Sequence, residues 1–319
     1  MTKKIKFAIA VLFSAATSHA WAETYPSKPI RLVIPFAAGS ATDAAGRLIA
    51  QGLSQRLGQA IVVDNRAGAN GQIAAVNVAQ SPADGYTVLM TTNSTHGANS
   101  YLYKNLAYDP LKDFDPVVRI GTLPFMLVIN PAVPATNLRE FLNYARAHPG
   151  ELSYGTSNTT SLICAEILNL REKAGLVGVP YKSSQQAILD LVAGRIQVMI
   201  ADFATAMPQV KAGKLKVLAV TPARGSALVP NAPPLASVLP ELNLISWNGL
   251  FVPAGTPRDI VARLEKETLA LLAQPEIAGK LATIGYEVGP MPRAQFALFV
   301  SEQMARWGTL IRAANIPME

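Results

Sequence analysis

Cysteine and histidine are scarce in this sequence of 319 residues. Cys164 is the only cysteine, and the histidines are His19, His96 and His148. A lone cysteine excludes a disulfide framework, so the fold must rely on its hydrophobic core. So few soft ligands also argue against a metal centre built from histidine and cysteine. We therefore expect neither a metal ion nor a cofactor.

Charged residues are also few, at 15% of the chain, and no block of lysine or arginine follows Lys6. The formal net charge is +7, but three of the 28 basic residues and none of the 21 acidic ones lie within residues 1–22. The rest of the chain holds 25 basic and 21 acidic residues, a net charge of +4. This thin excess argues against a nucleic acid partner and is compatible with small anionic molecules.

The familiar signatures of enzymes are missing as well. The sequence contains no G-x-S-x-G elbow, no Walker A loop and no G-x-G-x-x-G motif, each of which would indicate a specific chemistry. His96 and His148 do not belong to a recognised nucleophile motif. Binding without chemistry is therefore favoured. A hydrolase stays an alternative, because catalytic triads are defined by their geometry in space.

The chain begins with a segment of a different kind. Three lysines among the first six residues precede the apolar run FAIAVLFSAAT, and residues 20–22 form an A-x-A pattern. An apolar run of about ten residues is too short for a membrane-spanning helix, which needs about 20. Residues 1–22 are therefore predicted to be a signal peptide that is cleaved after Ala22, which places the mature protein in the periplasm.

Short strand-like runs alternate with helical patterns along the rest of the chain. Each run is bounded by Gly, Pro, Asn or Asp, as strands in an alternating fold are. The runs are IRLVIPF, AIVVDN, YTVLMTT, FMLVIN, LSYGTS, QVMIADF and LKVLAVT. The pattern predicts an α/β fold, and a chain of this length with 50% hydrophobic residues can bury the cores of two domains.

One strand-to-helix turn is of special interest, within RLVIPFAAGSATDAAGRLIA at residues 31–50. A helix is predicted from Asp43 to Leu57, and the first amides of a helix lack intrahelical partners, so its positive end favours an anion. Gly39 allows a ligand to approach the backbone closely, whereas Ser40, Thr42 or Asp43 can cap the helix. Capping alone is the alternative interpretation. Asp43 is assigned a positioning role.

A second loop of this kind is YGTSNTTS, residues 154–161. Its hydroxyl groups are neutral donors that suit a carboxylate, although a solvated, strongly capped turn would have the same composition. The repetition of hydroxyls favours a ligand. The residues concerned are Thr156, Ser157, Thr159, Thr160 and Ser161.

Two further strand ends carry polar residues, at TTNSTH, residues 91–96, and IADFATA, residues 200–206. Ligands of open α/β sheets gather at the carboxyl ends of the strands. His96 either donates to an anion or forms hydrogen bonds within its loop, and Lys182 is expected to be a surface charge. The candidate residues at these strand ends are Asn93, Ser94, Asp202 and Phe203.

Several blocks of the sequence resemble the substrate-binding proteins of tripartite tricarboxylate transporters, the Bug or TctC-type extracytoplasmic receptors. They recur in the order found in that family and span nearly all of the chain after the signal peptide. The first runs from YPSKPIRLVIPFAAGSATD to NRAGANGQIAA; the others are SPADGYTVLMTTNSTHGANSYLYKNLAYDPLKDFDPVV, VPYKSSQQAILDLVAGRIQVM, VKAGKLKVLAVT and GLFVPAGTP.

The resemblance implies a periplasmic binding protein fold of type II-like architecture with two lobes. Each lobe would be a mixed sheet flanked by helices, with the ligand cleft between the lobes. Residues 23–122 and 246–319 are expected to form lobe 1, and residues 123–245 lobe 2. The implied partners are a small carboxylate, aliphatic or aromatic, and the membrane subunits of a transporter, with the receptor itself a monomer.

The resemblance also implies where the ligand binds. The family holds a carboxylate at the loop and helix start that match Gly39, Ser40, Ala41, Thr42 and Asp43. The opposing lobe would contribute residues 156–161 and Asp202, while Phe36, Tyr181 and Phe203 leave aromatic ligands open.

The chain departs from the family pattern in both loops. It has PFAAGSATD where members typically have PFPPGGGTD, and TSNTTSLIC where they have a Gly/Ser-rich loop ending in His. The identity of the ligand therefore stays open. Three functions are in view: a carboxylate receptor for a secondary transporter, a sensor subunit for a signalling partner, and a periplasmic hydrolase.

Overall fold

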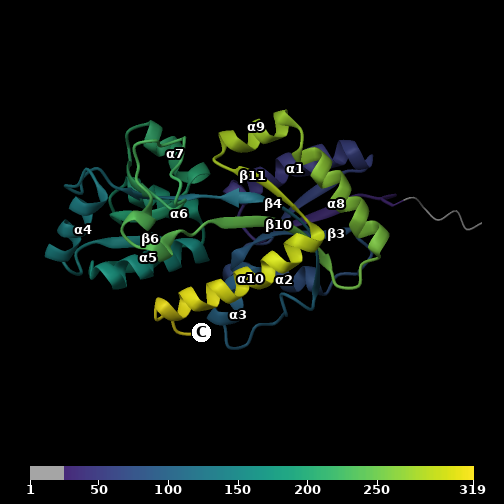
Figure 1. Ribbon diagram of the computed structural model, residues 1–319, viewed down its shortest axis with the longest axis horizontal. Helices are drawn as coiled ribbons and strands as arrows, with labels where there is room; N and C mark the ends of the chain where they lie inside the picture. The colour runs from purple at the N-terminus through teal and green to yellow at the C-terminus, as the bar shows by residue number, and fades with distance from the viewer. Residues whose placement is uncertain (1–24) are drawn as a thin grey trace, which may run out of the picture.

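Two mixed sheets, each covered by helices on both faces, form the two lobes of the protein (Figure 1). The computed structural model describes residues 25–319, so the predicted signal peptide, residues 1–22, lies outside the described residues. Within residues 25–319, each helix is too short or too polar to cross a membrane. The arrangement confirms the predicted fold class.

The sheet of the first lobe has six strands in the order β11-β4-β10-β3-β1-β2. Strand β1 is parallel to β2 and β3, whereas β10 runs antiparallel to β3 and β4, and β11 antiparallel to β4. The strands are β1 (Ile30–Ile34), β2 (Ile61–Asn65), β3 (Thr87–Thr92), β4 (Phe114–Leu123), β10 (Ser246–Pro253) and β11 (Glu287–Pro292). Strands β3 and β10 are buried along their whole length, as expected of strands covered on both faces.

Helices cover both faces of this sheet (Figure 1). One face carries α1 (Ala41–Leu57), α8 (Arg258–Leu272) and α9 (Pro275–Thr283), and the other carries α2 (Gln72–Ala79), α3 (Asn99–Leu102) and α10 (Arg293–Ala313). Two short helical turns, η1 (Ala69–Gly71) and η2 (Ser94–Ala98), precede α2 and α3. Helix α10 also contacts α5 (Thr159–Glu172) of the second lobe.

The sheet of the second lobe has five strands in the order β7-β6-β8-β5-β9. Alternate residues of β5 belong to two cores: Leu127 and Ile129 to one, Met126 and Val128 to the other, because successive side chains of a strand point to opposite faces. The strands are β5 (Phe125–Ile129), β6 (Ser153–Thr156), β7 (Val177–Pro180), β8 (Val198–Asp202) and β9 (Lys216–Val220).

Helices α4 (Leu138–Ala147) and α5 (Thr159–Glu172) pack in the core on one face of this sheet. Helices α6 (Ser184–Val192) and α7 (Phe203–Lys211) pack in the core on the other face. The turns η3 (Leu235–Ser237) and η4 (Pro240–Leu242) follow β9. The chain changes sheets between Leu123 and Phe125 and again before Ser246; the lobe division at 122/123 and 245/246 stays a prediction.

His96 belongs to the core of the first lobe. Its imidazole is fully buried, its ring centroid lies 4.0 Å from that of Phe251, and its Nδ1 atom lies 3.0 Å from the Thr95 hydroxyl. Of the two roles considered for His96, the structure shows hydrogen bonding within its own turn. Burial lowers the pKa of His96 from its ordinary value of 6.5 to about 3, because a charged imidazole loses its hydration there.

The pairing of β4 with β11 gives a first prediction. A Cβ at Gly121 would collide with the main-chain carbonyl oxygen of Glu287, so Gly121→Ala should destabilise the protein by about 1–3 kcal/mol. Gly279→Ala, in α9 with no heavy atom within 4 Å of the new Cβ, is the matched control and should be stabilising by up to about 1 kcal/mol. Urea unfolding midpoints measure both; equal midpoints would contradict this account of the pairing.

The buried His96 imidazole predicts a pH dependence. Between pH 3 and 6.5 the unfolded chain binds the proton that the folded protein excludes, so stability falls as the pH is lowered through this range. The loss attributable to His96 between pH 7 and pH 5 should be about 2 kcal/mol. His96→Gln should remove that part of the slope in urea unfolding at pH 7, 6 and 5. Asp202, which titrates with the opposite sign, is present in both proteins and cancels in the comparison. Equal slopes would refute the assignment.

Candidate functional site

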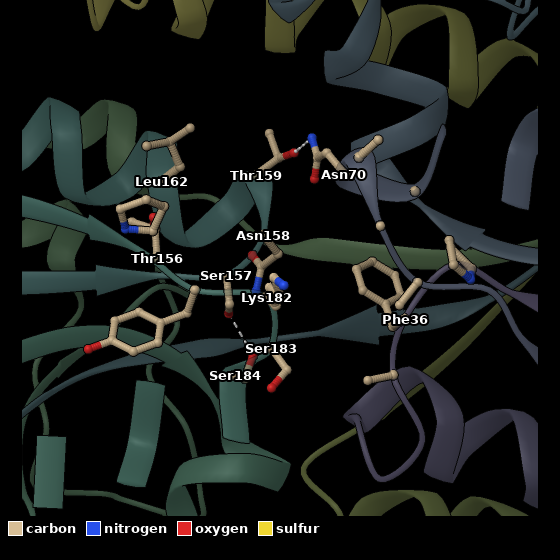
Figure 2. Close-up of a pocket in the computed structure, with 18 of the residues that line it drawn as sticks. Phe36, Asn70, Thr156, Ser157, Asn158, Thr159, Leu162, Lys182, Ser183 and Ser184 are labelled. Atoms are coloured by element: carbon tan, nitrogen blue, oxygen red, sulfur yellow. Dashed lines mark hydrogen bonds between the residues drawn. The ribbon is translucent and has the colours of Figure 1, made fainter. Parts of the chain in front are cut away.

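Two adjoining cavities lie between the lobes, with volumes of about 800 Å³ and about 40 Å³. Figure 2 shows Phe36 and Asn70 of the first lobe on one side of the larger cavity, and residues of the second lobe, such as Ser157 and Ser184, on the other. Both cavities are lined by Phe36, Ser40, Asn158 and Ser184. These four residues mark the place where the cavities meet.

Four helices begin at the walls of these cavities. Each is capped by a side chain that accepts from a first-turn amide: Ser40 from Asp43 N in α1, Asn158 from Ser161 N in α5, Ser183 from Gln186 N in α6, and Asp202 from Thr205 N in α7. The positive ends of four helix dipoles therefore lie at the space between the lobes. Such an arrangement favours an anion.

Most of the predicted ligand-binding residues line this space. The eleven that do so are Phe36, Ser40, Ala41, Thr42, Ser94, Thr156, Ser157, Thr159, Thr160, Tyr181 and Asp202. The other four, Gly39, Asp43, Asn93 and Phe203, line neither cavity. These four residues instead contact other parts of the protein.

Asp43 holds the turn that precedes α1. Its carboxylate is buried and accepts hydrogen bonds from Gly39 N at 2.8 Å, Arg47 Nε at 3.0 Å and Asn65 Nδ2 at 3.0 Å. Burial by itself would raise the pKa of Asp43, but these hydrogen bonds and the charge of Arg47 outweigh it and hold the pKa below its ordinary value. The cap of α1 is Ser40, so the carboxylate of Asp43 serves the turn at Gly39.

Asn93 connects the two lobes. Its Nδ2 atom donates to the Thr160 hydroxyl at 3.1 Å, and its Oδ1 atom accepts from the Ser246 hydroxyl at 2.6 Å. A second connection lies nearby, where Asn70 Nδ2 donates to the Thr159 hydroxyl at 2.7 Å. Both second-lobe partners belong to the first turn of α5, so this helix start is hydrogen-bonded directly to the first lobe.

Asp202 is a buried acid on the wall of the smaller cavity. Its Oδ1 atom accepts from Thr205 N and the Thr205 hydroxyl, each at 2.8 Å. Burial raises the pKa of Asp202, and the hydrogen bonds from Thr205 and Ser184 offset only part of this effect. The next residue, Phe203, is fully buried and packs against Gly285 of the first lobe.

A third wall of the larger cavity was missed by the sequence analysis. It is the start of α6, where Lys182, predicted as a surface charge, lines the cavity together with Ser183, Ser184 and Gln185 (Figure 2). The available signal was the pair Ser183 and Ser184 shortly after the strand that ends at Pro180, since serine is typical of a helix cap. Residues 67–71 of the first lobe also line this cavity.

Within residues 25–319, no group of three or more His, Cys, Asp or Glu side chains could hold a metal ion. Cys164 is buried in the core, and burial raises the pKa of its thiol. The polar residues at the cavities are instead mainly serines, threonines and asparagines, with Lys182, Asp202 and Glu319 as the charged ones. Hydroxyl, amide and ammonium groups can all donate hydrogen bonds to a carboxylate.

Known proteins resemble this chain over most of its length. A family model described as the tripartite tricarboxylate transporter family receptor, TctC, matches residues 45–316. A protein from the tcbD–tcbE intergenic region of Pseudomonas sp. strain P51 is 35% identical over 294 residues, which cover 91% of this chain and 87% of that protein.

Two solved structures have the same fold. Rpa4515 of R. palustris, solved with adipate, has a TM-score of 0.89 and 35% identity, covering 92% of this chain and 100% of that one. MatC of Rhodopseudomonas palustris, solved with bound malate, has a TM-score of 0.83 and 32% identity, covering 90% and 100%. The family model and these relatives together confirm the resemblance noted in the sequence: the chain belongs to the tripartite tricarboxylate transporter receptor family, the Bug or TctC proteins.

Proposed function

We propose that this protein is a periplasmic receptor, exported by the signal peptide at residues 1–22, that binds a small carboxylate between its lobes. As a monomer, it would deliver this ligand to the membrane subunits of a tripartite tricarboxylate-type transporter. The observation that carries the proposal is the convergence of four helix starts on the cavities between the lobes. Relatives solved with adipate and malate support a carboxylate ligand.

The ligand carboxylate would lie where the two cavities meet, beside Ser40, Asn158 and Ser184. Main-chain amides of the first helical turns and the serine hydroxyls supply the hydrogen bonds there. A hydrogen bond to a charged group contributes about 1.5–3 kcal/mol, from which the cost of ordering ligand and side chains is subtracted. Asp202 lies beside this position, where burial raises its pKa and Thr205 donates two hydrogen bonds to its Oδ1 atom; both effects reduce its repulsion of the anion.

Closure of the lobes would allow the transporter to distinguish the ligand-bound receptor from the empty one. Asn70 to Thr159 and Asn93 to Thr160 are hydrogen bonds between lobes, and a ligand that contacts both lobes adds further bonds of this kind. Only such a ligand favours the closed form over the open one. The transporter would then recognise the surface that the two lobes form together when closed.

Binding is favoured over hydrolysis by the position of the reactive side chains. His96 is fully buried in the first-lobe core, and the ring of His148 stacks on Tyr144; neither histidine lines either cavity. Among residues 25–319, the serines and threonines at the cavities therefore lack a histidine that could act as their general base. The family to which the chain belongs is a receptor family.

Isothermal titration calorimetry with a panel of aliphatic and aromatic acids tests the proposal. At least one acid should bind, and at 100 times its dissociation constant it should stabilise the protein by about 2.7 kcal/mol. Ser184→Ala should weaken binding about tenfold or more, because a donor to a charged group is lost. Ser301→Ala, on the exposed face of α10, is the control. A flat response of the unaltered protein to all acids would refute the proposal.

A further inference from the structure

A chain of hydrogen bonds leads from the buried acid Asp202 to the place where the two cavities meet. The Ser184 hydroxyl is hydrogen-bonded to the carboxyl group of Asp202. The hydroxyl oxygens of Ser184 and Ser157 lie 2.8 Å apart, and either can be the donor (Figure 2). Ser184 lines both cavities, Asp202 the smaller one and Ser157 the larger one. Ser184 therefore lies between Asp202 and the space for a ligand.

The carboxyl group of Asp202 is poorly placed to carry a charge next to a second anion. The residue is 4% exposed, and its Oδ1 atom accepts from the amide and the hydroxyl of Thr205. The smaller cavity has a volume of about 40 Å³, which leaves space for only a few atoms beside Asp202. Two carboxyl groups that share such a site rarely ionise together, because like charges repel strongly where water is excluded.

Asp202 is the only titratable residue among the described residues that line the smaller cavity. The other lining residues are apolar side chains, hydroxyls and Asn158. The larger cavity adds four titratable residues within the described part of the chain: Tyr103, Tyr181, Lys182 and Glu319.

The elements packed against β8 and α7 are α1, α5, α6, β5 and β6, and Phe203 packs against the turn at Gly285. Their charged residues line neither cavity. Several are paired within the protein: Asp43 with Arg47, Glu166 with Tyr154, Asp190 with Arg195, and Glu287 with Arg224. Others lie in the last turns of helices that begin at the cavities: Arg56, Arg171, Glu172 and Lys211.

The protonation state of Asp202 decides what Ser184 can offer a ligand. A hydroxyl has one hydrogen to donate, and an ionised carboxylate can only accept. While Asp202 is ionised, the Ser184 hydrogen is used for that bond, and only oxygen lone pairs remain for a ligand carboxylate. Once Asp202 is protonated, it can donate to the Ser184 oxygen. The Ser184 hydrogen is then free for the ligand.

We propose that Asp202 is a positioning residue that acts through Ser184: when a carboxylate binds, Asp202 takes up one proton from water and donates it in a hydrogen bond to the Ser184 oxygen. This inference rests on the proposed function, in which Ser184 contributes to the site of the ligand carboxylate. The proton offsets the charge that the ligand brings. Binding and proton uptake are therefore linked, and each favours the other.

The sign of the pH dependence follows from this linkage. The pKa of Asp202 is higher in the complex than in the free receptor, so binding is strongest below the free-receptor value and weakens above it. Between the two values the dissociation constant should rise about tenfold per pH unit. Burial already raises the pKa of Asp202 in the free receptor, which moves the start of this range above the ordinary value of an aspartic acid.

Isothermal titration calorimetry with adipate, malate and benzoate between about pH 6.5 and 8.5 tests the proposal, because these acids are almost fully ionised there. The dissociation constant of an acid that binds should rise with pH. At pH 8, titrations in HEPES and in Tris, which differ in their enthalpies of ionisation, give the number of protons taken up. That number should approach about one per acid bound.

Asp202→Asn imitates the protonated acid. Asparagine can still cap α7, and its amide group can donate to the Ser184 oxygen at every pH. This variant should bind without proton uptake and with a constant affinity, so at pH 8.5 it should bind at least about threefold more tightly than the unaltered protein. Asp259→Asn, an exposed acid in the first turn of α8, is the matched control and should keep the slope of the unaltered protein.

Ser184→Ala tests the route through the hydroxyl. In this background, Asp202→Asn should bring a smaller gain in affinity at pH 8.5 than it does in the unaltered protein, because the two residues act together. An equal gain in both backgrounds would show simple charge repulsion and would overturn the role of Ser184. Urea unfolding midpoints report whether each variant is folded.

The unaltered protein decides the proposal even if Asp202→Asn fails to fold. Acid binding without proton uptake, or with equal pH slopes in the unaltered protein and a folded Asp202→Asn variant, refutes the role of Asp202 and leaves the receptor function standing. If none of the three acids nor any acid of the wider panel binds, both the proposed function and this inference fail.

Discussion

An α-helix cannot satisfy the first amides of its own backbone, and the arrangement of this protein depends on that constraint. Four helices, α1, α5, α6 and α7, begin at the same space between the lobes. Each cap satisfies one first-turn amide with a side-chain oxygen, and the positive ends of the four helix dipoles lie at the cavities. The proposed anion site therefore depends mainly on where these helices begin, since Lys182 is the only basic residue among the described lining residues. The scarcity of charge in the sequence and the proposed carboxylate ligand are compatible for this reason.

An acidic side chain near an anion site repels the anion unless its negative charge is offset. The carboxylate of Asp43 accepts three hydrogen bonds, one of them from the charged Arg47, so it stays ionised and fixes the turn at Gly39. Asp202 caps α7 in a buried setting that raises its pKa. The two acids are therefore accommodated beside the proposed anion site in different ways. Partners inside the protein offset the charge of Asp43, whereas burial shifts the titration of Asp202 toward the neutral acid.

Much of the site could be predicted locally, because caps and loops between strand and helix leave signals within a few residues. The loops at Ser40 and at residues 156–161 were found in this way, and both line the cavities. Lys182 and Gln185 were not found, because a lysine and a glutamine near a helix start usually face solvent. Asn93 and Phe203 were predicted as ligand contacts from their place at strand ends; neither lines a cavity, since Asn93 is hydrogen-bonded to both lobes and Phe203 is packed in a core. Periodicity cannot tell which side of a strand end faces the cleft.

The sequence by itself determined the α/β alternation, the turns that start helices and the membership of a receptor family, since these depend on short-range patterns and on blocks of similar residues. The tertiary structure alone decided which helix starts meet, because residues as distant along the chain as Gly39 and Gln185 approach each other only when two lobes fold and face one another. It also decided that His96 belongs to an aromatic core and that the amide of Gln185 is buried without a partner among the described residues. Burial and pairing are properties of packed neighbours, and no local pattern carries them.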